Sequence, residues 1–113
     1  MNLSKFLPLT ETTYYILLSL CEPLHGYGIM QRVNELSHGS VDIAPGTMYG
    51  ALDNLKKQNL IGLVSEDAEK RRKIYSLSDL GRQVLVLEYQ RMQTLVAIST
   101  PYLEGGETKC KTQ

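Results

Sequence analysis

The sequence predicts a mainly α-helical fold with one small β-hairpin, and three observations lead to this prediction. Apolar residues recur every three to four residues in four segments, which is the spacing of an amphipathic helix. Between the third and fourth segments, two short β-prone runs flank a polar stretch, as strands flank a hairpin turn. The fourth segment is apolar around about half of its circumference, which is more than one core-facing stripe requires.

The composition indicates one globular domain with little excess charge. A length of 113 residues suits one domain, and 42% hydrophobic and 21% charged residues are ordinary for a soluble protein. The formal net charge is zero, so nucleic-acid binding would have to come from a local arrangement of charge. Between Lys56 and Arg82, seven basic residues stand against four acidic ones. We therefore expect moderate, salt-sensitive affinity for phosphate.

The sequence contains no pattern typical of a metal site, a cofactor site, a membrane span or an enzyme. Cys21 and Cys110 lack metal-ligand spacing, and we expect Cys21 to be a buried core thiol and Cys110 to lie in a polar tail. There is no Gly-rich phosphate loop and no nucleophile with a placed base. The first residues contain no long apolar run, which favours a cytoplasmic protein.

The first two helices are predicted from their caps and apolar spacing. After a short arm at residues 1–8, the first helix extends from its N-cap Thr10 to about Leu20. Apolar residues cover so much of this helix that we expect it to contact a second surface besides its own core. The second helix opens at His25-Gly26-Tyr27 and continues to about Leu36.

The third helix is predicted from Pro45, which suits a first helical turn, to about Asn59, which tolerates the left-handed conformation found after many helices. Its apolar stripe consists of Met48, Ala51, Leu52 and Leu55. Its other side presents small and polar residues, namely Thr47, Tyr49, Gly50, Asp53, Asn54 and Lys57. A helix with this leading end suits the major groove of DNA.

The hairpin is predicted as strands at 60–64 and 72–77 around a polar turn at 65–71, with a further short strand at 41–43. Side chains of the return strand alternate between two faces, with Lys73, Tyr75 and Leu77 on one and Arg72, Ile74 and Ser76 on the other. Each face carries one basic residue, so either of them could face a duplex.

The last helix is predicted from its N-cap Ser78 to about residue 100, where Pro101 ends it. Its apolar residues form two adjoining sectors, one of Leu80, Val84, Leu87, Leu95 and Ile98 and one of Leu85, Tyr89, Met92 and Val96. Such a wide apolar surface needs a second cover, and the natural one is the same helix of a symmetric dimer.

Two helices, a short strand, a third helix and a hairpin are the order of a winged helix-turn-helix domain, in which the third helix reads base edges. We therefore divide the chain into a DNA-binding domain at residues 1–77, a dimerisation helix at 78–100 and a disordered tail at 101–113. The expected fold class is mainly α with a small β-hairpin.

Five short motifs in order make the sequence resemble the PadR-like transcriptional regulators over about residues 6 to 98, specifically the short type with one C-terminal dimerisation helix. The motifs are Leu24-His25-Gly26-Tyr27 with Ile29, Gly46-Thr47-Met48-Tyr49 with Leu52 and Leu55, Leu60-Ile61, Arg71-Arg72-Lys73 with Tyr75, and Leu77-Ser78 with Gly81. The chain departs from the family pattern at Gly50, Asn54 and Asn59, where the family usually or often has Pro, Arg and Gly.

The resemblance implies a homodimeric, sequence-specific DNA-binding repressor that recognises an inverted repeat in double-stranded DNA and is released by a small-molecule effector not yet identified. The candidate DNA-binding residues are His25, Tyr27, Ala44, Gly46, Thr47, Tyr49, Gly50, Asn54, Lys57, Lys70, Arg71, Arg72 and Lys73. The candidate dimer residues are Tyr14, Leu17, Leu85, Tyr89, Met92 and Val96.

Alternatives remain open at several of these positions. Tyr27 and Tyr49 can contact phosphate or pack within the domain, and His25 can cap its helix or donate to phosphate. An apolar pocket for an effector could be lined by Tyr14, Tyr15, Tyr89 and Met92, although packing explains them as well. The zero net charge also allows a winged-helix module that contacts protein and does not bind DNA.

Overall fold

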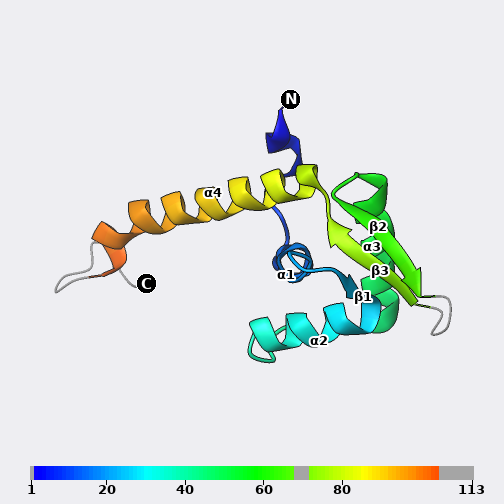
Figure 1. Cartoon of the computed structure of the whole chain (residues 1–113). Coiled ribbons are helices and arrows are strands. Elements are labelled where there is room, and N and C mark those ends of the chain that lie inside the picture. Colours follow the sequence, from blue (N-terminus) through cyan, green and yellow to red (C-terminus); the bar gives the residue numbers. More distant parts are fainter. Residues whose placement is uncertain (1, 68–71, 105–113) are drawn as a thin grey trace.

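The computed structural model describes residues 2–67 and 72–104. In chain order it contains η1 (Leu3–Phe6), α1 (Glu11–Ser19), β1 (Leu24–His25), α2 (Gly26–Leu36), α3 (Pro45–Lys57), β2 (Ile61–Asp67), β3 (Arg72–Leu77) and α4 (Asp79–Leu103). Helices α1 to α3 pack with the sheet, and α4 projects away from them (Figure 1). Among the described residues, no helix combines the length and the apolar character that a membrane span needs.

The predicted ends of three helices are confirmed by their local hydrogen bonds. Thr10 Oγ1 accepts from the Thr13 amide at 3.1 Å, and Ser78 Oγ accepts from the Gly81 amide at 2.9 Å, so both side chains cap free amides at a helix start. Asn59 follows α3 with a φ of 62°, the left-handed conformation expected of it.

The sheet has the order β1-β3-β2, and both pairings are antiparallel. The hairpin pairs Ile61 with Leu77, and a bulge between Leu63 and Ser65 lets β2 continue to Asp67, beyond the predicted end at residue 64. The predicted strand at residues 41–43 is wrong, because these residues form no strand and the edge beside β3 is taken by Leu24–His25. A strand of two residues is too short to show a period in the sequence.

The hydrophobic core joins all three helices of the domain to the sheet and to the first turns of α4. Its buried members are Ile16, Leu17, Leu20, Ile29, Val33, Ile43, Met48, Leu52, Leu55, Leu60, Ile61, Tyr75, Val84 and Leu85. The prediction of a buried Cys21 is wrong, because α1 ends at Ser19 and the thiol lies exposed in the following turn.

Helix α4 continues through Pro101 to Leu103, so the prediction that Pro101 ends it is wrong. Proline has a φ compatible with a helix, although its ring removes one hydrogen bond and crowds the carbonyl four residues before it. The helix resumes its hydrogen bonding at once, since the Glu104 amide donates to the Thr100 carbonyl at 3.0 Å. Cys110 and most of the predicted tail lie outside the described residues.

Gly81 sets the distance between the first turn of α4 and the chain that enters β2. A Cβ at this position would overlap the backbone carbonyl of Leu60 and would also press on the Leu77 side chain. The same carbonyl accepts a hydrogen bond from the Ser78 amide at 3.1 Å, so it cannot move without breaking that bond. The start of α4 therefore requires a residue without a side chain.

We predict that Gly81→Ala lowers the free energy of unfolding by about 1–3 kcal/mol, as overpacking of a tight contact does. Gly50→Ala is the matched control, because a Cβ there meets nothing within 4 Å and alanine favours a helix. Urea unfolding at one protein concentration measures both. A Gly81→Ala variant as stable as the parent would contradict the close contact.

Candidate nucleic-acid interface

A cleft of about 420 Å³ lies between the start of α2, the middle of α3 and the start of β3. Its lining combines basic, aromatic and acidic side chains with one glycine, namely His25, Gly26, Tyr27, Tyr49, Asp53, Arg72, Lys73 and Tyr75. These residues come from elements up to 50 positions apart in the chain, and the pairing of β1 with β3 brings them together.

A hydrogen bond of 3.1 Å joins Arg72 Nη1 to His25 Nε2 across the cleft. Strand pairing makes this contact possible, because His25 lies opposite Ile74, two residues after Arg72. A guanidinium group only donates, so Nε2 is the acceptor in this contact. The ring also lies beside the Tyr27 ring, with 6.5 Å between the two centroids.

Tyr49 reaches from α3 to the first residue of α2. Its hydroxyl oxygen is 2.7 Å from the position that a Cβ would occupy at Gly26, so glycine there makes room for the phenol. Half of the Tyr49 residue remains exposed (50%), and it can still donate to a bound group. Beneath it, burial raises the pKa of Tyr75, and the neighbouring Tyr49 and Asp53 raise it further, so its hydroxyl stays protonated at neutral pH.

The exposed side of α3 carries small and polar residues beside this cleft. Gly46, Thr47, Gly50 and Asn54 are all exposed, as is the cap residue Ala44. A Cβ at Gly46 or Gly50 would meet nothing within 4 Å, so the helix surface there is open to close approach by another molecule. Its buried side is the predicted stripe, with Met48, Leu52 and Leu55 in the core.

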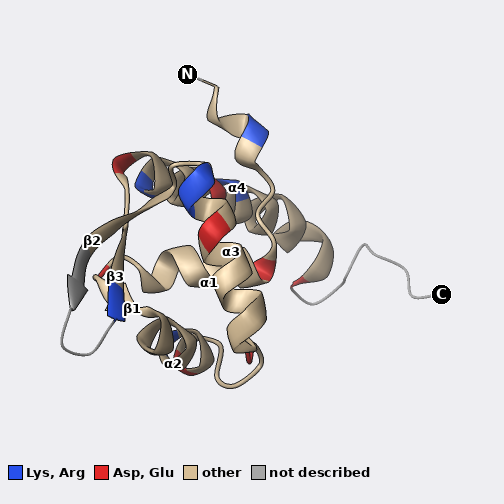
Figure 2. Cartoon of the chain, turned by 90° about the vertical axis from the view of Figure 1, so that its right-hand side faces the viewer, with Lys and Arg blue, Asp and Glu red and all other residues tan. Residues whose placement is uncertain are grey.

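Basic and acidic residues both occur in several elements, and basic residues lie at the start of β3 beside the N-terminal end of α2 (Figure 2). Of the four predicted basic residues of the hairpin, Arg72 and Lys73 line the cleft, whereas Lys70 and Arg71 lie outside the described residues. Lys57 is near the other end of α3, where it shares a shallow hollow with Lys5 and Phe6.

A second candidate surface lies on the projecting part of α4. From Tyr89 onward every residue of this helix is exposed or half-buried, although many are apolar. The exposed large apolar side chains of this part are Tyr89, Leu95, Val96, Ile98, Tyr102 and Leu103. Tyr89, Met92 and Val96 line one hollow of about 470 Å³ on the helix, but the expected partners Tyr14 and Tyr15 do not line it.

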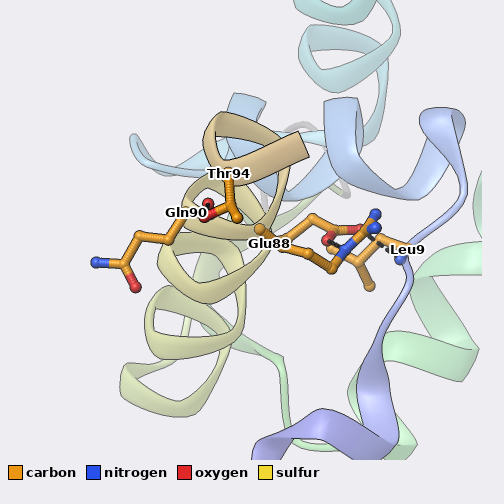
Figure 3. A network of polar contacts seen from close by, with 5 residues as sticks. Leu9, Glu88, Gln90 and Thr94 are labelled. Carbon is orange, nitrogen blue, oxygen red and sulfur yellow. Dashed lines mark hydrogen bonds and ion pairs between the residues drawn. The ribbon is translucent and has the colours of Figure 1, made fainter. Parts of the chain in front are cut away.

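Glu88 fixes α4 to the domain immediately before this apolar part begins. Its residue is 1% exposed, and its carboxylate accepts from the Leu9 amide at 2.7 Å and from Arg91 Nε (Figure 3). The hydrogen bond from Arg91 lowers the pKa of Glu88 against the opposing effect of burial, and the bond from Leu9 lowers it further. The chain in front of α1 is thereby held against α4.

A search of protein families matches residues 15–86, well over half of the chain, to the transcriptional regulator PadR-like family. The chain belongs to the PadR-like family of transcriptional regulators. The match covers the cleft, α3 and the first turns of α4, and the arrangement of α2, α3 and the hairpin is the winged helix-turn-helix of its structural relatives.

Solved structures agree with this assignment. A PadR family transcription regulator from Clostridium difficile is 26% identical, with a TM-score of 0.71 over 84% of this chain and 100% of that one. A PadR family regulator from Eggerthella lenta is 25% identical, with a TM-score of 0.66 over 83% and 82% of the two chains. RosR from H. salinarum is 25% identical, with a TM-score of 0.63 over 84% and 96%.

Among curated proteins, the chain is 33% identical to the transcriptional regulator YqjI of Escherichia coli over 61 residues. That match covers 54% of this chain but only 28% of YqjI. A protein of 37.1 kDa in a transposon of Streptomyces fradiae is also 33% identical, over 65% of this chain and 20% of its own length. The chain therefore spans about a quarter of the length of these relatives.

The structure brings together part of the predicted DNA-binding set in this PadR-like chain. His25, Tyr27, Tyr49, Arg72 and Lys73 line one cleft, whereas Lys57 lies apart from it. Of the predicted dimer residues, Tyr89, Met92 and Val96 share one hollow on α4 and Tyr14 is half-buried.

Two of the predicted dimer residues offer little surface to a partner. Leu17 has no exposed surface, because it packs inside its own domain, and Leu85 is nearly covered by the same core. We therefore assign these two residues to the core of the domain and not to the dimer interface. A broadly apolar helix does not reveal which of its residues its own domain covers.

The sequence analysis placed Asp53 on the polar side of the third helix, but it missed Tyr75 as a lining residue and Glu88 as an anchor. A signal for Glu88 was present, since the buried residues of α4 are Gly81, Val84, Leu85 and Glu88, spaced as one helical stripe. A carboxylate at a core position of such a stripe indicates a buried, hydrogen-bonded group. Tyr75 gave no such signal, because its place in the cleft depends on long-range strand pairing.

We predict that Glu88→Gln lowers the free energy of unfolding at neutral pH by about 1–3 kcal/mol, since it removes a charge that accepts two hydrogen bonds. The pKa of Glu88 is lower in the folded than in the unfolded chain, so its contribution is complete above the unfolded value and is lost as the pH falls below it. The difference between parent and variant should therefore shrink in acid.

Glu22→Gln is the matched control for this prediction, because Glu22 also faces an arginine, Arg32, at 3.8 Å but its side chain is 72% exposed. We expect it to change the unfolding free energy by less than about 1 kcal/mol. Thermal or urea unfolding between neutral and acid pH measures both variants. A Glu88→Gln deficit that stays constant down to acid pH would contradict the role of the charge.

Proposed function

We propose that this PadR-like regulator binds double-stranded DNA as a homodimer and recognises an inverted repeat. One observation carries the proposal. The exposed small and polar side of α3 and the basic start of β3 lie on either side of one cleft. In a winged helix-turn-helix, the first turn of the third helix contacts base edges and basic groups beside it contact the phosphates.

Within this proposal, α3 supplies the contacts that depend on sequence. Thr47 offers a hydroxyl and a methyl group, and Gly46 and Gly50 allow the helix backbone to approach the groove closely. Lys73 and Arg72 supply contacts to phosphate, which add affinity without reading the sequence. Asp53 repels phosphate, so we expect the duplex to approach the leading end of α3 more closely than its middle.

The dimer in this proposal forms through α4. A helix surface with Leu95, Val96 and Ile98 each about half exposed or more would be covered by the same surface of a second copy. Two reading helices related by a two-fold axis then contact half-sites about one turn of DNA apart, ~34 Å.

In this proposal the bound dimer represses transcription because it occupies DNA that a polymerase needs. The resemblance to PadR-like proteins is its support, and a small-molecule effector stays a prediction of the same resemblance. The zero net charge favours one second candidate, a winged helix that contacts another protein. Binding measurements with DNA separate this candidate from the first.

We predict that the protein retains DNA from its own upstream region in a gel shift at low salt and releases it as salt approaches the physiological range. Failure to retain any genomic fragment at low salt would favour the protein-contact candidate. Fluorescence anisotropy with the retained fragment and with an unrelated duplex then gives the specificity ratio.

In the same assay, Thr47→Ala should reduce discrimination between specific and unrelated duplexes by about 1–3 kcal/mol if its contact is to a base. Lys73→Ala should weaken binding to both duplexes alike and reduce the salt slope by about one. Lys56→Ala is the matched control, because Lys56 is exposed at the end of α3 away from the cleft. Equal loss in the Lys56 and Lys73 variants would contradict the role of the cleft.

We also predict that light scattering gives a mass twice the 12.7 kDa of one chain, and that Val96→Glu gives the single-chain mass. A charge at a residue that is 66% exposed in the isolated chain leaves the fold intact but cannot be buried against a partner. Gln90→Glu, on an exposed polar position of α4, is the control and should stay dimeric. A parent protein that remains a monomer at micromolar concentration would refute the dimer.

A further inference from the structure

We propose that Glu88 is a positioning residue that sets the direction of α4 and thereby the spacing of the two half-sites that the dimer recognises. The inference rests on the proposed function, a homodimer that binds an inverted repeat, and it names the residue on which the spacing depends. Its basis is the hydrogen bond from the Leu9 amide to the Glu88 carboxylate, at the point where α4 leaves its own domain.

Glu88 lies at the boundary between two parts of α4. The buried residues of the helix are Gly81, Val84, Leu85 and Glu88, so the domain buries the helix up to Glu88 and buries no residue of it beyond that point. The helix then continues away from the domain through exposed residues (Figure 1). A helix bends only gently over this length, so its last fixed point decides where the exposed part lies.

The bond from Leu9 ties α4 to the rest of the domain at this point. The Leu9 amide donates to Glu88 Oε2 at 2.7 Å, and Leu9 directly precedes Thr10, the N-cap of α1 (Figure 3). Arg91 donates to Glu88 Oε1, but Arg91 lies on α4 itself, so this second contact orients the carboxylate without joining two elements. Glu88 therefore fixes α4 against the start of α1.

The burial of a carboxylate at this position favours a role in direction over a role in stability. Glu88 is 1% exposed, and removing a carboxylate from water is unfavourable unless hydrogen bonds offset the loss. An apolar side chain would pack here without that cost, but apolar packing is non-directional. A hydrogen bond constrains both a distance and an angle, so it fixes the orientation of the helix that carries it.

The effect of this tie on DNA follows from the length of the exposed part. From Glu88 to Ile98 the helix extends about 15 Å, so a rotation of about 10° at Glu88 moves Ile98 by about 3 Å relative to the domain. One base pair advances a duplex by about 3.4 Å and turns it by about 35°. A small change in the direction of α4 is therefore enough to move the second reading helix of the dimer out of register with its half-site.

The test uses the intact chain and duplexes that carry the half-site found in the retained fragment. Two inverted half-sites are separated by the natural spacer or by spacers one or two base pairs shorter or longer, and a further duplex carries a single half-site. Fluorescence anisotropy gives the affinity for each duplex. The parent should prefer one spacing over those two base pairs away by at least about tenfold, because simultaneous contact with both half-sites is lost when the geometry does not match.

Three variants change the tie in different ways. Glu88→Met is unbranched but has no oxygen to accept from Leu9, so its preference among spacings should fall below about threefold or move by a base pair or more. Glu88→Asp keeps the charge with one methylene less of reach and should also change the preferred spacing. Glu88→Gln keeps an acceptor at the same reach and should restore the spacing of the parent. Affinity for the single half-site should stay unchanged in all three, because α3 is untouched.

Light scattering and urea unfolding first establish that each variant is a folded dimer under the assay conditions, and Glu88→Asp decides the question if Glu88→Met does not fold. Glu22→Met is the matched control, because it makes the same exchange at a side chain that is 72% exposed. Val33→Ala lowers stability within the core at α2, away from α4, and should keep the spacing of the parent. It separates a loss of stability from a change of direction.

The outcomes separate the inference from the function beneath it. A spacing preference like that of the parent in both Glu88→Met and Glu88→Asp overturns the role of Glu88 and leaves DNA binding and the dimer intact. A Glu88→Gln variant that shifts as far as Glu88→Met also overturns it, because the acceptor would then not matter. A parent protein that binds DNA without preference for any spacing overturns both the inference and the inverted repeat, and absence of DNA binding overturns the proposed function as a whole.

Discussion

The pairing of Leu24–His25 with β3 is the constraint on which the rest of this structure depends. It joins the turn between α1 and α2 to the hairpin through an antiparallel pairing. Because β3 pairs with β1 on one edge and β2 on the other, its first residues lie beside the start of α2. The cleft, the contact between His25 and Arg72 and the place of Lys73 all follow from this short pairing.

In a protein of zero net charge, a basic surface arises only where the fold gathers basic side chains together. Here the arrangement brings Arg72 and Lys73 next to the middle of α3, while Glu22 and Glu35 lie near Arg32 elsewhere on the surface. Asp53 also lines the cleft, and its negative charge offsets part of the positive charge of the site. Affinity for a polyanion would then depend on geometry, which makes it sensitive to anything that shifts the start of β3.

Helix α4 changes character along its length, and Glu88 marks the change. Before it, Gly81, Val84 and Leu85 face the domain core, and after it no residue is buried by its own chain. A buried carboxylate needs hydrogen-bonded partners to offset its desolvation, and it finds them in Leu9 and Arg91. The direction in which the apolar part projects is thus held by specific polar contacts and by the close approach of Gly81 to the Leu60 carbonyl.

The sequence by itself determined the features that local interactions control. Thr10 and Ser78 cap their helices, Asn59 takes the left-handed conformation, and the return strand has the predicted bounds Arg72–Leu77, because each depends on residues only a few positions away. Tertiary structure decided what depends on residues distant in the chain. It placed β1 beside β3, left Cys21 exposed, buried Leu17 and Glu88 and set Asp53 and Tyr75 into the cleft. Periodicity shows that a face is apolar or polar, but only packing decides what covers that face.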